Sequence, residues 1–172
     1  MLVFLAGAAL FYLRITQYYY QNKTLRVGRE GDMILAFNPQ FRSWPFLVLQ
    51  TLTWIEQEIP PDVTLVAMPD GGILNYLARR RNPTPYLLFD PVVMLGYGEE
   101  RVLKALTDHS PDYIILVNKD TSEFGVGRFG QDPRYGKDIW TWVSRHYRPV
   151  ALFGRDPLQS LDFGIEVFQR RD

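Results

Sequence analysis

The hydrophobic pattern divides the chain into an apolar start and a longer part in which helix-like and strand-like segments alternate. Residues 1–13 read MLVFLAGAALFYL and contain no charged or strongly polar side chain. Thirteen helical residues extend for only about 20 Å, whereas the hydrocarbon core of a bilayer is about 30 Å thick. No basic segment precedes the run, as one would in a signal peptide. We therefore interpret residues 1–22 as the end of a truncated transmembrane helix.

The residues that follow the apolar run support this interpretation. Arg14, three consecutive tyrosines at Tyr18–Tyr20, and Lys23 suit the region where a helix leaves a membrane, because tyrosines sit at headgroup level and basic side chains extend outward. The alternative is a packed core helix, which is typical of 10–14 apolar residues. Residues 2–13 are apolar all round, however, whereas a surface helix of a small domain has a polar face.

From Asp32 onward, the apolar residues follow helical or strand spacing in turn. Residues 23–43 are interpreted as a linker and entry segment, and residues 44–172 as an extramembrane α/β domain. The expected elements are a helix over 44–59, a strand over 63–67, a short helix after 69–71, a strand over 86–89, a helix over 99–109, a strand over 113–117, a helix over 137–147, and strands over 149–153 and 163–168.

This alternation predicts the fold class. Strands separated by helices of about ten residues form βαβ units, with a mostly parallel sheet and helices on both faces. No helix separates the last two expected strands, so one edge of the sheet should be antiparallel. The sequence therefore predicts an α/β fold: a three-layer, Rossmann-like domain with a mostly parallel sheet and an antiparallel edge, preceded by an N-terminal apolar helix.

Composition excludes several classes of function. The chain has 172 residues, which suggests one domain, and its 19 Lys and Arg balance 19 Asp and Glu. A nucleic-acid-binding domain normally has a basic excess, so we expect no nucleic-acid partner. There is no cysteine, and the two histidines, His109 and His146, have no second ligand nearby on their helices. We therefore expect no metal site and no cofactor, and interpret both histidines as packed or partly exposed.

Polar residues follow two of the expected strands and indicate a candidate site. Asp70 and Asp120 each come just after a strand, and ligands of open α/β sheets bind at the carboxyl ends of strands. If these strands are parallel neighbours, one crevice can be lined by Asp70, Asn75, Asp120, Glu123 and Arg128. The alternative is that Asp70 caps a helix and Asp120 belongs to an ordinary turn. Nothing in the flanking residues indicates a catalytic carboxylate pair, so no catalytic residue is assigned.

Two further patterns are weaker. Residues 125–130 match GxGxxG, but neither a preceding strand nor a following helix adjoins them, as a dinucleotide site requires. A glycine-rich loop that packs Phe124 and Phe129 onto the domain is the favoured interpretation. Arg79–Arg81 are interpreted as a solvated helix end, with contact to an anionic group as the alternative.

A set of local motifs resembles a known family. They are the runs over 69–77 and 79–86, Pro111–Ile115, Glu123–Gly125, Phe129–Gly130, Tyr135–Gly136 and the helix around Trp142. Together they resemble the C-terminal extramembrane domain of bacterial polytopic glycosyltransferases of family 39, the relatives of protein mannosyltransferases and lipid A aminoarabinose transferases. The resemblance covers roughly residues 30–170, and the apolar start fits the end of the last membrane helix.

The resemblance implies a function for the parent protein rather than for this chain. In that family the membrane part uses a polyprenyl-phosphate sugar donor, and an acidic residue of its first extramembrane loop is the catalytic base. That segment lies outside this chain. The expectation is a non-catalytic domain at the bacterial cell membrane, facing the periplasm or exterior, that shapes acceptor access or binds a partner. Its expected partners are membrane lipid, through the N-terminal helix, and a glycan or lipid-linked sugar acceptor.

Two alternatives remain open. The first is a soluble α/β enzyme or small-ligand-binding domain that uses the crevice at the strand ends, with residues 1–22 as an ordinary packed helix. The second is a structural interaction module without a formed pocket.

Overall fold

The computed structural model describes residues 2–171, and for Leu2 the backbone alone. Its elements are α1 (Leu2–Gln21), β1 (Leu25–Val27), β2 (Ile34–Ala36), α2 (Trp44–Glu58), β3 (Leu65–Met68), α3 (Gly72–Ala78), α4 (Pro91–Tyr97), α5 (Glu99–Asp108), β4 (Tyr113–Val117), the 3₁₀ turn η1 (Ser122–Phe124), α6 (Lys137–His146), β5 (Tyr147–Gly154) and β6 (Gly164–Arg170).

Four strands form one mixed sheet in the order β3-β4-β6-β5. β3 and β4 are parallel, whereas β6 runs antiparallel to both of its neighbours, β4 and β5. The α/β class is therefore confirmed, but the expectation of a mostly parallel sheet is not. The reason is that β6 follows β5 after a short turn and enters the sheet between β4 and β5, so one strand creates two antiparallel pairs.

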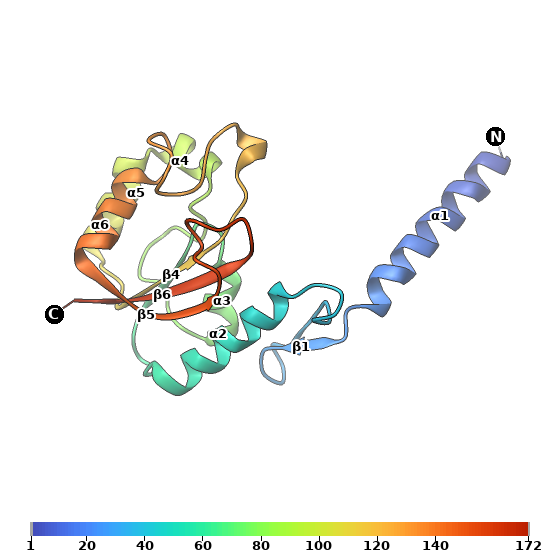
Figure 1. Cartoon of the computed structure of the whole chain (residues 1–172), viewed down its shortest axis with the longest axis horizontal. Coiled ribbons are helices and arrows are strands. Elements are labelled where there is room, and N and C mark those ends of the chain that lie inside the picture. The colour runs from blue at the N-terminus through green and yellow to red at the C-terminus, as the bar shows by residue number, and fades with distance from the viewer. Residues whose placement is uncertain (1, 172) are drawn as a thin grey trace.

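Helices cover both faces of this sheet (Figure 1). α2 and α3 pack on one face, against Tyr113, Ile115 and Val117 of β4. α4, α5 and α6 pack on the other face, against Ile114 and Leu116. All of β4 is buried, as expected for a strand covered on both sides. The domain thus has three layers with two hydrophobic cores.

The N-terminal part lies outside these layers. α1 extends away from the domain (Figure 1), and its described side chains are exposed except for that of half-buried Thr16. Phe4 and Phe11 are 78% and 68% exposed. β1 and β2 form a two-stranded antiparallel sheet within the segment that the sequence indicated as a linker. Within residues 2–171, no helix combines the length and the apolar character needed to cross a membrane.

One segment differs in kind from the sequence prediction. Residues 86–89 were expected to form a strand, but they form irregular chain, in which Phe89 is buried and its N–H donates to the Pro69 carbonyl at 2.7 Å. The unexpected helix α4 begins just after it. Asp90 accepts a hydrogen bond from the Val93 N–H at 2.9 Å, and Pro91 occupies the first helical position, two features that favour a helix start.

The basic run at Arg79–Arg81 is also not simply a solvated helix end. Arg80 is buried, and its guanidinium donates to the carbonyls of Ile55 and Ile59 at the end of α2 and of Ala78 in α3. The shortest of these bonds, 2.7 Å, goes to the carbonyl of Ile59, the C-cap of α2, where a helix end leaves carbonyl groups without intrahelical partners. Arg79 forms an ion pair with Asp32. This arrangement leaves only Arg81 of the three as an exposed cation without a protein partner among the described residues.

Candidate functional site

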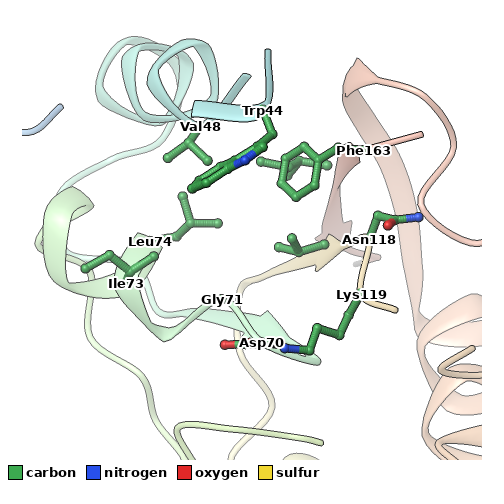
Figure 2. A pocket seen from close by; sticks show the side chains of 11 residues that line it. Trp44, Val48, Asp70, Gly71, Ile73, Leu74, Asn118, Lys119 and Phe163 are labelled. Atoms are coloured by element: carbon green, nitrogen blue, oxygen red, sulfur yellow. Dashed lines mark hydrogen bonds and ion pairs between the residues drawn. The ribbon is translucent and has the colours of Figure 1, made fainter. Parts of the chain in front are cut away.

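A cavity of about 270 Å³ lies at the carboxyl ends of the two parallel strands, β3 and β4 (Figure 2). This is the edge of an α/β sheet at which ligands bind. The lining is mostly apolar, with one ion pair and one amide, and its residues come from α2, the β3–α3 turn, α3, the end of β4 and β6. They are Trp44, Val48, Asp70, Gly71, Ile73, Leu74, Val117, Asn118, Lys119, Phe163 and Ile165.

The turn after β3 brings α3 close to the sheet. At Gly71 a Cβ atom would lie 2.7 Å from the Cβ of Ala67 and 3.2 Å from Cγ2 of Val117. Only glycine allows the backbone to pass so near both strands. Gly71 is also the N-cap of α3, so Asp70 does not cap that helix and its carboxylate is available at the cavity.

An ion pair forms the polar side of the cavity. Nζ of Lys119 lies 2.9 Å from Oδ2 of Asp70. The hydrogen bond to Asp70 raises the pKa of Lys119; burial opposes this shift, and the charges of Asp70, Glu123 and Asp90 add to it. The positive charge of Lys119 is therefore stabilised by three carboxylates, those of Asp70, Glu123 and Asp90. The pair is partly open to solvent, since the two side chains are 32% and 44% exposed.

Two aromatic rings form the opposite side. In Figure 2, Trp44 and Phe163 lie across the cavity from Asp70 and Lys119, with ring centroids 6.0 Å apart and planes tilted by 53°. Trp44 is the first residue of α2, and Phe163 directly precedes β6. This geometry suits a compact apolar group with a polar substituent directed at the ion pair.

Asn118 connects the end of β4 to the turn between β5 and β6. Its side-chain amide donates to the carbonyls of Pro157 and Ser160 at 3.3 and 3.0 Å. Its own N–H donates to the Gly164 carbonyl at 2.9 Å. The turn that precedes Phe163 is thus fixed relative to the ion pair.

Of the five residues predicted from the sequence, the structure places one, Asp70, in the lining of the cavity. Asn75 is buried beneath it, where its amide donates to the carbonyls of Leu65 at 2.6 Å and Arg80 at 3.3 Å. These bonds join α3 to the start of β3, so Asn75 has a structural role and does not reach the cavity.

The other three lie on the connection that follows Lys119. Asp120 accepts a hydrogen bond from the Ser122 N–H at 2.9 Å, which matches the turn alternative, and this contact is the main cause of the lowered pKa of Asp120. Glu123 is exposed in η1. Arg128 donates to the Leu158 carbonyl at 3.2 Å. None of the three lines the cavity.

Sequence reasoning missed Lys119, Trp44 and Phe163. Lys119 follows β4 as Asp70 follows β3, so the same rule about strand ends would have found it. Nothing in the local pattern distinguishes Trp44 or Phe163 from other aromatic residues, because both reach the cavity through the packing of α2 and of the β5–β6 turn onto the sheet.

A second cavity, also about 270 Å³, adjoins the first on the side of β1 and β2. Trp44, Val48 and Ile73 line both cavities. The second is lined as well by Lys23 and Phe37, close to the end of α1. A nearly continuous apolar path therefore leads from the strand ends to the base of α1.

The structure also places the remaining candidate groups. In the range 2–171, no cluster of three His, Asp or Glu side chains is arranged to hold a metal ion. Both His109 and His146, which were interpreted as packed or partly exposed, are exposed. In the loop over 125–130, Phe129 is buried as expected, whereas Phe124 is 39% exposed.

No protein-family model matches the sequence, and comparisons with curated proteins and with solved structures found no match either. The resemblance to family 39 glycosyltransferases therefore stays a prediction.

Proposed function

We propose that this chain is the non-catalytic C-terminal extramembrane domain of a membrane glycosyltransferase-like protein. In this proposal α1 is the end of a membrane helix and the three-layer, Rossmann-like domain faces the periplasm or exterior of a bacterial cell. Sugar transfer from a polyprenyl-phosphate donor belongs to the membrane part. The observation that carries the proposal is the exposed, apolar α1, which projects from a domain whose only strand-end site is an apolar cavity with one ion pair among the described residues.

The proposal assigns α1 to lipid because its apolar side chains over residues 3–13 are all exposed. Val3, Phe4 and Phe11 are more than 65% exposed, and no α1 residue contributes to either buried core cluster of the described chain. A contiguous exposed apolar surface normally marks a protein or membrane contact.

Site-directed labelling tests this assignment cleanly, because the chain has no native cysteine. Ala8→Cys places a thiol in the middle of α1, and Glu100→Cys places one on the exposed surface of α5. In cells that make the protein, we expect a membrane-impermeant maleimide to modify position 100 once the outer membrane has been permeabilised. Position 8 should stay protected until detergent dissolves the membrane. Equal modification of both positions would contradict membrane insertion.

The accessory role is tested in the full-length protein. Trp44→Ala and Asp70→Ala alter opposite sides of the cavity, so we expect a changed acceptor preference while the basal transfer reaction continues. Leu161→Ala is the matched control, because this side chain is 93% exposed and lies outside the cavity lining. Unchanged acceptor preference in both cavity variants would contradict the role. Complete loss of transfer in a folded Asp70→Ala protein would contradict the assignment as non-catalytic.

A second candidate function, small-ligand binding, is favoured by the cavity itself. Its position at the carboxyl ends of parallel strands, its aromatic wall and its Lys119–Asp70 pair suit a small apolar ligand that carries one polar group. A screen of aromatic and cyclic aliphatic carboxylates tests this, with binding detected through the indole NMR signal of Trp44. We expect binding that Trp44→Ala abolishes and Trp54→Ala preserves. No perturbation of the Trp44 signal by any of these compounds would remove the candidate.

A further inference from the structure

Aromatic side chains from two separate segments meet at the base of α1. Tyr18 and Tyr19, near the end of α1, contact Phe41 with centroid distances of 5.5 and 6.2 Å. Phe37 lies 6.0 Å from Tyr19 and 5.0 Å from Phe41. The collar, as we name it, consists of these rings with their neighbouring ring and two cations: Tyr18, Tyr19, Tyr20, Lys23, Phe37, Phe41 and Arg42.

Hydrogen bonds hold the two segments of the collar together. The Asn38 N–H donates to the Asn22 carbonyl at 2.8 Å, and the Asn38 side chain donates to Oδ1 of Asn22 at 3.3 Å. Asn38 also accepts a bond from the Phe41 N–H at 2.9 Å. The segment over 37–42 is therefore fixed beside the last turn of α1, so the collar has a defined shape.

The two cations of the collar lie over its rings. Nζ of Lys23 is 5.1 Å from the Tyr20 centroid and 5.4 Å from that of Phe37. The guanidinium carbon of Arg42 is 5.8 Å from the centroid of Phe37 and 5.9 Å from that of Phe41. Such cation–π contacts orient a charge without neutralising it.

These charges are available to an anion from outside the chain. Neither Lys23 nor Arg42 has a carboxylate within 4 Å in the part of the chain that the structure describes, whereas Arg29 and Arg79 form ion pairs with Glu56 and Asp32. Residues 1–42 contain five Lys or Arg and two Asp or Glu, a net charge of +3. Because the whole chain is neutral, the remainder carries −3.

We propose that the collar binds the surface of an anionic lipid bilayer, with its rings at headgroup level and Lys23 and Arg42 on lipid phosphates. This inference rests on the proposed attachment of α1 to a membrane. Aromatic rings favour the membrane–water interface, and lysine and arginine bind anionic lipid surfaces. The anionic surface repels the acidic residues 43–172. The collar therefore anchors α1 at the bilayer, while charge repulsion keeps the layered domain away from it.

Fluorescent labels at three single-cysteine positions test the proposal in the full chain. An environment-sensitive fluorophore at Gln40→Cys reports on the collar, one at Ala8→Cys on α1, and one at Glu100→Cys on the distant α5; all three positions are exposed. The chain is mixed with vesicles of phosphatidylcholine, with or without phosphatidylglycerol. We expect the label at 8 to enter an apolar environment with both vesicles, the label at 40 to do so far more strongly with phosphatidylglycerol, and the label at 100 to stay in water.

A matched pair of charge variants shows whether the collar cations are responsible. Lys23→Gln with Arg42→Gln removes two collar charges, and Arg101→Gln with Lys137→Gln removes two exposed charges from α5 and α6. At about fivefold in affinity per charge near the surface, the loss of two charges should make the collar variant need roughly 25-fold more anionic lipid to shift the label at 40. The α5–α6 variant should match the parent, and identical thermal melting of both variants confirms that they are folded.

Failure of this inference differs from failure of the proposed function. If the label at 8 enters lipid while the label at 40 stays in water or ignores phosphatidylglycerol, the collar proposal is wrong and membrane attachment stands. If neither label responds to vesicles, membrane attachment fails and the collar proposal fails with it. If inorganic phosphate alone shifts the label at 40 equally, the collar recognises free phosphate rather than a bilayer, which also overturns the proposal.

Discussion

The ammonium group of Lys119 and the carboxylate of Asp70 lie 2.9 Å apart, although the two residues are 49 positions apart in the chain. Each follows a strand of the parallel pair β3–β4. The pair is thus a direct consequence of strand pairing, and it gives the cavity its only charged lining groups among the described residues.

Asp70→Asn should lower the pKa of Lys119 toward the ordinary lysine value, because the hydrogen bond to Asp70 is the largest cause of its raised pKa. An NMR titration of the lysine Cε signals measures this, with Asp62→Asn as the control. A raised lysine pKa contributes stability that is present below the ordinary pKa of about 10.5 and is lost as pH rises through the raised value. This contribution should be below about 1 kcal/mol, since the pair is partly solvated. An unchanged Lys119 titration in Asp70→Asn would contradict the geometry.

Gly136→Ala should destabilise the domain much more than Gly125→Ala. Both glycines have positive φ, +68° and +67°, so both substitutions cost backbone strain. A Cβ at Gly136 would also lie 2.4 Å from the buried ring of Phe129, whereas at Gly125 nothing lies within 4 Å. We expect the difference to be about 1–3 kcal/mol, typical of overpacking. Urea unfolding of the two variants measures it, and equal losses of stability would refute the packing described for Phe129.

Asp112→Asn should destabilise the protein at neutral pH by about 1–2 kcal/mol, because the carboxylate joins three strand ends. Asp112 accepts bonds from the Thr64 N–H and hydroxyl at 2.8 and 2.7 Å and from Arg170 at 2.9 Å. Burial acts to raise the pKa of Asp112, but the bonds from Thr64 and the charge of Arg170 outweigh it and the pKa is lowered.

The sign of the pH dependence follows from that lowered pKa. The stability that Asp112 contributes is present above its ordinary pKa of about 3.8 and is lost as pH falls through the lowered value. The difference between the parent and Asp112→Asn should therefore shrink in strong acid. Combining Asp112→Asn with Thr64→Val should cost less than the sum of the single changes. A constant difference at all pH values would show that the charge is not involved.

Glu166→Gln should stabilise the protein at neutral pH. Burial raises the pKa of Glu166, and the charge of Asp156 adds to this, so the ionised form is disfavoured in the folded state. The associated stability is present below the ordinary glutamate pKa and is lost as pH rises through the raised value. We expect a gain below about 1 kcal/mol, because the side chain is half-exposed and solvent screens its charge. Thermal melts between acidic and neutral pH measure it, and a gain that persists unchanged in acid would contradict this cause.

The sequence predicted elements well where burial leaves a clear pattern. Tyr113–Val117 is apolar throughout because helices cover both faces of β4, and its bounds were predicted correctly. The helix around Trp142 was predicted to within one residue from its apolar spacing. The segment over 86–89 has a similar apolar pattern but forms no strand: Leu87 and Leu88 are exposed, and Phe89 alone is buried, in the cluster that includes Met94 of α4.

The site was predicted less completely, for a physical reason. The rule about strand ends finds Asp70 from local sequence, and it applies equally to Lys119. The aromatic wall depends on where α2 and the β5–β6 turn pack, which local spacing does not encode. Likewise, the position of β6 between β4 and β5 is a property of the assembled sheet, so the sequence predicted an antiparallel edge but not an inserted strand.

That inserted strand also determines when the domain can be completed. During synthesis β3, β4 and β5 are made before β6. The strand that pairs with both β4 and β5 is therefore missing until the ribosome has passed residue 170. Domains fold as cooperative units while the chain is made from its N-terminal end. In a nascent chain that stops before β6, β4 has only one of its two pairing partners, β3. Since Phe163 and Ile165 come from this same segment, the cavity at the strand ends can be completed only after β6 has joined the sheet.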